Sequence, residues 1–131
     1  MSEKLAERFI AALQQIESGG EADDMASLFA DECEIGNVTL SETLHGRDGV
    51  KEFWTHYRET LGEVRSTFKN KVIGDKTIAL EWNTTGKSRN QEDVDYNGVS
   101  VMETEGDKIR RFFAYYNPAK LGSQLSHTAN Q

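Results

Sequence analysis

The sequence contains few of the residues that mark special classes of protein. Its 131 residues include one proline and one cysteine, so a proline-rich chain is excluded and Cys33 has no intramolecular disulfide partner. No stretch approaches the roughly 18 consecutive apolar residues of a membrane-spanning helix. The first residues lack a basic segment followed by an apolar one, so no secretory signal is expected. These absences predict a cytoplasmic protein that does not enter a membrane.

The chain also lacks an excess of positive charge. Its formal net charge is −7, and an acidic surface repels phosphate backbones. Arg110 and Arg111 are adjacent, but neighbouring residues of a strand face opposite sides of a sheet. We therefore expect no nucleic-acid partner. Because no Cys/His spacing is typical of a zinc site, no metal and no cofactor are expected either.

The residues that are present predict one ordered domain over 1–131, with a frayed tail at about 126–131. Apolar residues at helical spacing predict helices over about 5–16, 23–30 and 46–61, the last ended by Gly62. Strand-like segments follow, separated by glycine-containing turns. We expect strands over 33–40, 64–73, 76–85, 93–104 and 108–117, and one closing helical turn with Leu121 and Leu125. Residues 41–45 are expected to form a loop.

This order of elements predicts the α+β class, with an antiparallel sheet covered by helices on one side. A strongly curved sheet that wraps around helices leaves a conical space between the two layers. Such a space is a common place for a ligand pocket.

Three segments are typical of a known family: residues 25–32 (MASLFADE), residues 45–50 (HGRDGV) and residues 107–125, from DKIRR through YYNP to QL. Together with the order of elements, they resemble the SnoaL-like branch of the nuclear-transport-factor-2-like superfamily. The resemblance implies a cone-shaped, cystatin-like fold with three N-terminal helices on a curved, mainly antiparallel sheet. That family includes polyketide cyclases, ketosteroid isomerases, epoxide hydrolases and non-catalytic binding domains, so fold alone does not specify a function.

The positions that carry chemistry in those enzymes hold other residues here. The resemblance places Ala114 where polyketide cyclases and epoxide hydrolases have an acid–base aspartate. It places Asn37 at the general base of the ketosteroid isomerases, Phe9 at their oxyanion-binding tyrosine, and about Val99 at their oxyanion-binding aspartate. These replacements argue against the three known mechanisms and leave a different one open.

Aromatic side chains are the main candidates for lining a pocket. If Ala114 faces the cone, alternation along the strand puts Arg110, Phe112 and Tyr116 on the same side. The predicted ligand-binding residues are Asn37, Trp54, Tyr57, Trp82, Met102, Phe112 and Tyr116. The alternative for each aromatic residue is a place in an ordinary core, since large aromatic side chains are usually buried.

Asp95 and His45 are the candidate catalytic residues. Asp93 and Asp95 share a face at the start of a strand, as an acid–base pair at a pocket mouth would, but two solvated acids at a strand end are the simpler explanation. His45 titrates near neutral pH, but its place before a helix also fits a helix-entry residue. Cys33 has no evident base nearby, which favours a small core residue over a nucleophile.

Two functions remain open at this stage. The first is a small-molecule-binding protein with an apolar conical pocket, working as a cofactor-free isomerase, cyclase or hydrolase on an apolar carbonyl or ring compound. The second is a non-catalytic ligand-binding or dimerisation module, favoured by the missing carboxylates at Asn37 and Ala114. A sheet face rich in Val, Phe and Tyr would suit a homodimer.

Overall fold

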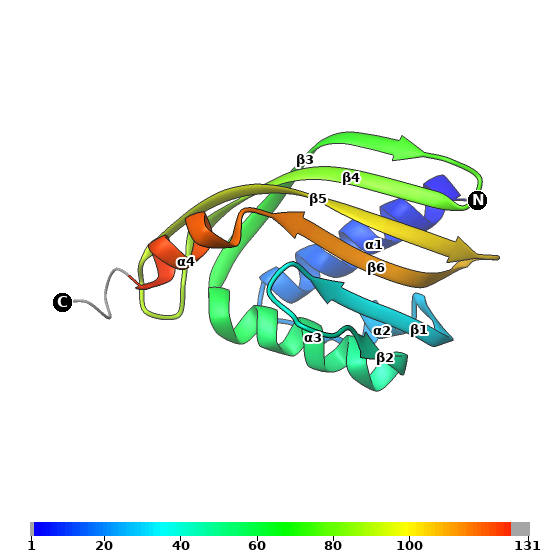
Figure 1. Ribbon diagram of the computed structural model, residues 1–131, viewed down its shortest axis with the longest axis horizontal. Coiled ribbons are helices and arrows are strands. Elements are labelled where there is room, and N and C mark those ends of the chain that lie inside the picture. Colours follow the sequence, from blue (N-terminus) through cyan, green and yellow to red (C-terminus); the bar gives the residue numbers. More distant parts are fainter. Residues whose placement is uncertain (1, 127–131) are drawn as a thin grey trace.

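A computed structural model describes residues 2–126 and confirms the α+β class (Figure 1). The N-terminal part contains α1 (Ser2–Glu17), α2 (Asp23–Ala26), β1 (Phe29–Asn37), β2 (Leu44–His45) and α3 (Gly46–Leu61). The C-terminal part contains β3 (Glu63–Ile73), β4 (Thr77–Lys87), β5 (Asp93–Glu105), β6 (Lys108–Tyr116) and α4 (Pro118–Ser126). Beyond Ser126, the tail expected to fray lies outside the described residues, as does His127.

The strands form one sheet in the order β2-β1-β6-β5-β4-β3. All neighbouring pairs are antiparallel except β1 and β6, which run parallel, so the expected mainly antiparallel sheet is confirmed. Figure 1 shows the sheet curving over α1 and α3, with α4 at one end. α1 packs on β3 and β4, α3 packs on β1, and α4 packs on β5.

The core lies between the concave face of the sheet and the helices. Leu5, Phe9, Leu13 and Ile16 recur at helical spacing in α1 and are all buried, as an amphipathic helix requires. On β4 and β5 the even-numbered residues face inward, and most of them are buried. α3 ends at Gly62, whose φ of +70° is a left-handed conformation suited to glycine.

The boundary between α2 and β1 differs from the prediction. The expected helix over 23–30 ends at Ala26, and the first strand begins at Phe29 instead of residue 33. Phe29 pairs with Ile109 of β6, and the Ile109 amide donates to the Leu28 carbonyl at 2.9 Å. Pairing with a strand some 80 residues away therefore overrides the local helical pattern.

Two loops were also predicted with the wrong boundaries. β1 ends at Asn37 instead of residue 40, because the Asn37 side chain accepts hydrogen bonds from the amide and the hydroxyl of Thr39 and turns the chain. The expected loop over 41–45 contains β2, which pairs with β1. The closing segment is a nine-residue helix, α4, in place of a single turn.

Arg110 does not share the inward face of β6. The β5–β6 ladder shifts between Glu103 and Thr104, so one extra residue of β6 bulges out. A bulge reverses the alternation of side chains along the strand. Ile109 and Phe112 are therefore both buried, while Arg110 is exposed and pairs with Glu103. The prediction that Arg110 faces the cone is wrong, whereas Phe112 and Tyr116 both face inward.

Candidate functional site: an aromatic chamber behind an open groove

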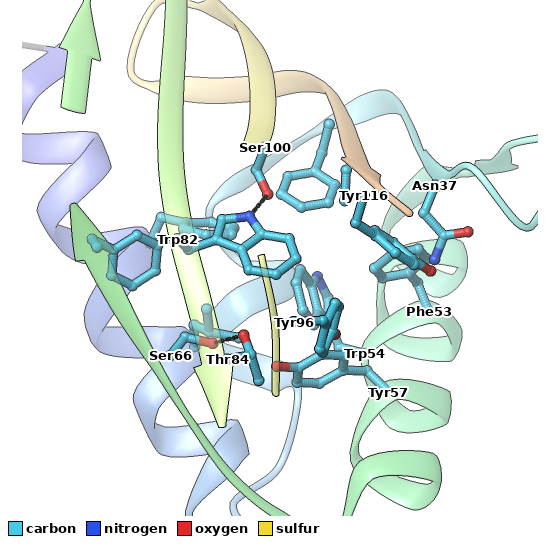
Figure 2. Close-up of a pocket in the computed structure, with 15 residues that line it drawn as sticks. Asn37, Phe53, Trp54, Tyr57, Ser66, Trp82, Thr84, Tyr96, Ser100 and Tyr116 are labelled. Carbon is cyan, nitrogen blue, oxygen red and sulfur yellow. Dashed lines mark hydrogen bonds between the residues drawn. The ribbon is translucent and has the colours of Figure 1, made fainter. Parts of the chain in front are cut away.

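A small chamber lies between the concave face of the sheet, α1 and α3 (Figure 2). It encloses about 60 Å³, room for a few water-sized groups. Nine of its 15 lining residues are aromatic. The lining consists of Phe9, Leu13, Asn37, Phe53, Trp54, Tyr57, Ser66, Phe68, Trp82, Thr84, Tyr96, Ser100, Phe112, Ala114 and Tyr116.

The chamber is not filled by side chains because the residues in the middle of the sheet are small. Ser100 of β5 lies directly opposite Ala114 of β6, and Ala114 lies beside Asn37 of β1. A further small residue on β5, Gly98, pairs with Trp82, and a Cβ at Gly98 would lie 2.5 Å from the indole. The glycine therefore leaves the space that the Trp82 ring occupies.

The aromatic rings form two groups around this space. On the helix side, Trp54 contacts Phe53, Tyr57, Phe112 and Phe9, with ring centroids 5.0, 5.2, 5.5 and 6.0 Å away. At the other end, Trp82, Tyr96 and Tyr116 contact one another, with Trp82–Tyr96 and Tyr96–Tyr116 centroid distances of 5.2 and 5.4 Å. Edge-to-face contacts such as these hold the rings in place.

The two indole N–H groups of the chamber differ in their partners. Trp82 Nε1 donates to Ser100 Oγ at 2.9 Å. Trp54 Nε1 has no hydrogen-bond partner among the described residues. Because Trp54 is only 4% exposed, this N–H is also shielded from solvent. In Figure 2 this nitrogen is turned toward the space that the lining residues enclose. A buried donor without an acceptor is costly, so an acceptor atom in the chamber would be stabilised.

One wall of the chamber rests on a buried carboxylate, Glu17, at the end of α1. Its carboxylate accepts hydrogen bonds from Tyr57 Oη at 2.7 Å, the Ser66 amide at 2.9 Å and Ser66 Oγ at 2.5 Å. Ser66 Oγ also lies 2.7 Å from Thr84 Oγ1. This network links α1, α3, β3 and β4 through the side chains that line the chamber.

The tyrosines around the chamber are held in the neutral form. Burial raises the pKa of Tyr57 well above its usual value, and the nearby Tyr96 and Glu17 add to the shift. Burial is also the main cause that raises the pKa values of Tyr96 and Tyr116. Their hydroxyl groups are therefore hydrogen-bond donors at neutral pH and not proton acceptors.

A larger groove of about 730 Å³ opens next to the chamber, between α3, α4 and residues 37–44. Its lining includes apolar side chains from all three segments, among them Leu44, Leu61, Leu121 and Leu125. The two spaces share five lining residues: Asn37, Phe53, Tyr57, Tyr96 and Tyr116. These shared residues lie where the enclosed chamber meets the open groove.

Six of the seven residues expected to bind a ligand line the chamber: Asn37, Trp54, Tyr57, Trp82, Phe112 and Tyr116. Met102 faces the same side of the sheet but lies deeper in the core, fully buried against the helices and lining neither space. Strand alternation predicted its face and could not predict its depth.

The candidate catalytic residues lie apart from this chamber. Asp95 is exposed, accepts a hydrogen bond from Asn83 and is tied to Gln124 of α4 through its backbone. Asp93 is exposed and pairs with Lys87, which lowers the pKa of Asp93. His45 is exposed in a shallow acidic hollow near Glu34 and Arg110. None of the three lines the chamber or the groove.

Local sequence patterns did not identify five residues in or behind the chamber wall: Glu17, Ser66, Thr84, Tyr96 and Ser100. A signal existed for Glu17, since it follows Leu13 by four residues and so continues the buried stripe of α1. Val99 was matched to an oxyanion-binding position, but Ser100 faces the chamber and Val99 faces outward. Cys33 is buried in the core, as expected.

Within residues 2–126, two other kinds of feature are absent. In this part of the chain, no group of three or more His, Cys, Asp or Glu side chains is placed to hold a metal ion. No helix there has the length and apolar character needed to cross a membrane.

Comparisons with known proteins identify related sequences and structures. The family described as "SnoaL-like domain" matches residues 6–112. No curated protein matches the chain.

Several solved structures share the fold. A SnoaL-like polyketide cyclase, so titled, from Jannaschia sp. has a TM-score of 0.84 at 9% identity, covering 97% of this chain and 94% of its own. An isomerase, so titled, from Rhodopseudomonas palustris has a TM-score of 0.81 at 12% identity over 100% of both chains. A protein with a ketosteroid isomerase-like fold from Catenulispora acidiphila, in complex with trimethylamine, has a TM-score of 0.79 at 15% identity, covering 94% of this chain and 95% of its own.

Proposed function

This chain belongs to the SnoaL-like domain family, and on that premise we propose that it binds a small, mostly apolar organic molecule. One end of the molecule enters the aromatic chamber, and the remainder lies in the groove. The observation that carries the proposal is the buried Trp54 N–H, which has no acceptor within the described chain. A ligand that brings an oxygen atom to Trp54 satisfies this donor while its apolar surface replaces water against the aromatic rings.

Binding fits the chamber better than acid–base catalysis of the kind expected from the sequence. The chamber lining contains no carboxylate or imidazole side chain. Its titratable lining groups are tyrosines whose raised pKa values keep them protonated. These groups can donate hydrogen bonds to a ligand, but they do not supply a proton acceptor near neutral pH.

Tryptophan fluorescence tests the proposal directly, because the two tryptophans of the chain, Trp54 and Trp82, both line the chamber. We expect cyclohexanone, and its hydrocarbon counterpart methylenecyclohexane more weakly, to change the emission. Trp54→Phe removes ring surface as well as the N–H, so it should weaken both ligands, but the affinity for cyclohexanone should fall about tenfold more than that for the hydrocarbon, the value of one hydrogen bond.

Trp82→Phe is the matched control, because it removes an indole whose N–H is already satisfied by Ser100. It should weaken both ligands to a similar extent. Equal losses for both ligands in Trp54→Phe would remove the role assigned to the free N–H. The absence of any emission change across larger cyclic ketones, ethers and hydrocarbons would contradict the binding proposal.

We further propose that the chain forms a homodimer through the outer face of the sheet. Ala79, Val101 and Phe113 are direct neighbours across β4, β5 and β6, and Val99 lies opposite Tyr115, which is 46% exposed. These five residues form a continuous apolar patch, which is uncommon on the surface of a monomer.

Sedimentation at micromolar concentration tests the dimer. The wild-type protein should sediment as a dimer and Val101→Glu as a monomer, since the variant places a charge in the centre of the patch. Thr77→Glu is the control, because Thr77 is exposed on the same face at the end of β4. A monomeric wild-type protein would refute this arrangement.

A further inference from the structure

A carboxylate, that of Glu17, lies directly behind the Tyr57 and Ser66 wall of the chamber, and no basic side chain of the described residues pairs with it. Glu17 is only 7% exposed, and its three hydrogen-bond donors, on Tyr57 and Ser66, are all uncharged. None of the ion pairs formed by residues 2–126 includes Glu17. No lysine, arginine or histidine lines the chamber. A carboxylate removed from water is stabilised by a nearby positive charge, so the chamber favours a cation.

The remaining walls suit a cation of a particular kind. Two tryptophans and three tyrosines line the chamber, and these are the rings whose electron-rich faces bind cations best. The rings come from the helix side and from the sheet, so a small group inside has aromatic surface on more than one side (Figure 2). Aromatic enclosures of this type bind ammonium groups whose charge is spread over methyl groups.

The hydroxyl groups of the chamber favour an alkylated ammonium over a primary one. Ser66 and Thr84 are hydrogen-bonded to each other, Ser66 also donates to Glu17, and Ser100 accepts from Trp82. Few acceptor atoms are therefore left for the three N–H groups of a primary ammonium, and burying them without acceptors is costly. A trimethylammonium group has no N–H to satisfy.

We propose that the end of the ligand held in the chamber is an alkylated ammonium group, with Glu17 as its counter-charge and the tryptophan and tyrosine rings as its contact surface. This inference rests on the proposed function, because it assigns the charge of the molecule that the chamber takes. The free N–H of Trp54 binds an oxygen atom elsewhere on the same ligand.

Choline and 3,3-dimethylbutan-1-ol provide a matched pair of probes. They have the same shape and the same hydroxyl group, and they differ by one positive charge. The wild-type protein should bind choline at least tenfold more tightly than the neutral alcohol, as measured by tryptophan fluorescence and calorimetry. This comparison needs no variant, so it decides the proposal even if substitutions at Glu17 impair folding.

Glu17→Gln identifies the source of the preference, because the amide retains an oxygen acceptor and removes the charge. The ratio of the two affinities should fall to within about threefold, chiefly through weaker choline binding. Asp107→Asn is the control for net charge: Asp107 is exposed in the β5–β6 turn and lines neither space. Since distant exposed charges are screened by salt, this variant should keep the wild-type ratio.

The outcomes separate this inference from the proposed function. Equal binding of the two probes, or tighter binding of the neutral alcohol, overturns the ammonium assignment and leaves the binding site in place. The same holds if neither probe binds while cyclohexanone does. If none of these three ligands binds, the ammonium assignment is overturned, and if the larger cyclic ketones, ethers and hydrocarbons also fail to bind, the binding proposal is overturned as well. A preference for choline that survives Glu17→Gln overturns the role of Glu17.

Discussion

Ala114→Leu is expected to abolish ligand binding and leave the protein folded. Ala114 lies beside Ser100 and Asn37 at the centre of the chamber wall. A leucine there adds three carbon atoms to a space of about 60 Å³. Because the chamber is partly empty, the larger side chain fills space that the ligand needs. We expect affinity to fall at least about 100-fold.

The effect of Ala114→Leu on stability should be small by comparison. Filling a cavity stabilises a protein, and crowding a packed site typically costs about 1–3 kcal/mol, so the two effects oppose each other. Thermal unfolding should therefore change by only a few degrees. Ala11→Leu is the matched control, since Ala11 is exposed on α1, and it should bind ligand normally. Unchanged binding by Ala114→Leu would place the ligand outside the chamber.

Glu17→Ala is expected to have the largest effect on stability. It removes the acceptor of three hydrogen bonds, from Tyr57 Oη, the Ser66 amide and Ser66 Oγ. A buried donor left without a partner typically costs about 1–3 kcal/mol. Because Ser66 keeps its contact with Thr84, part of the network survives. We expect a loss of roughly 3 kcal/mol in the free energy of unfolding and about 10 °C in Tm.

Urea and thermal denaturation measure this loss. Glu7→Ala is the control, because Glu7 is exposed on the same helix, and it should change stability by less than about 0.5 kcal/mol. A double-mutant cycle with Ser66→Ala should be non-additive, since both changes disrupt one network. Stability equal to that of Glu7→Ala would show that the carboxylate is not part of the folded core.

The same buried network connects stability to recognition. Glu17 holds α1 against β3, and its hydrogen-bond partners Tyr57 and Ser66 form part of the chamber wall. A substitution that loosens the network therefore moves the lining as well as the helix. For this reason Glu17→Gln is the variant for binding measurements, and Glu17→Ala is the variant for stability.

The elements with strong local patterns could be predicted from the sequence. The apolar stripe of α1, the stripe of α3 ended by Gly62, and the strict alternation along β4 each depend on neighbouring residues only. The same alternation correctly placed Trp82, Phe112 and Tyr116 on the inner face of the sheet. The α+β class follows from the order of these elements.

Features that depend on distant partners were decided by the tertiary structure. Phe29 joins a strand because Ile109 pairs with it, and Arg110 turns outward because β6 bulges against β5. Met102 and Ser100 lie on the same face of one strand, yet the curvature of the sheet places Met102 in the core and Ser100 at the chamber. Alternation records the face of a residue and contains no information on its depth.

The hydrogen-bonding partners of the polar residues in the site could not be predicted from local patterns either, because they also depend on residues that are distant in the sequence. Glu17 meets Ser66 across 49 positions of the sequence, and the free N–H of Trp54 exists only because no neighbour in the folded chain supplies an acceptor. The sequence by itself determined which elements form and which faces are apolar, because those depend on residues a few positions apart. The tertiary structure alone decided which polar groups are paired and which remain free to bind a ligand, because hydrogen bonds between elements depend on distances that only the packed chain sets.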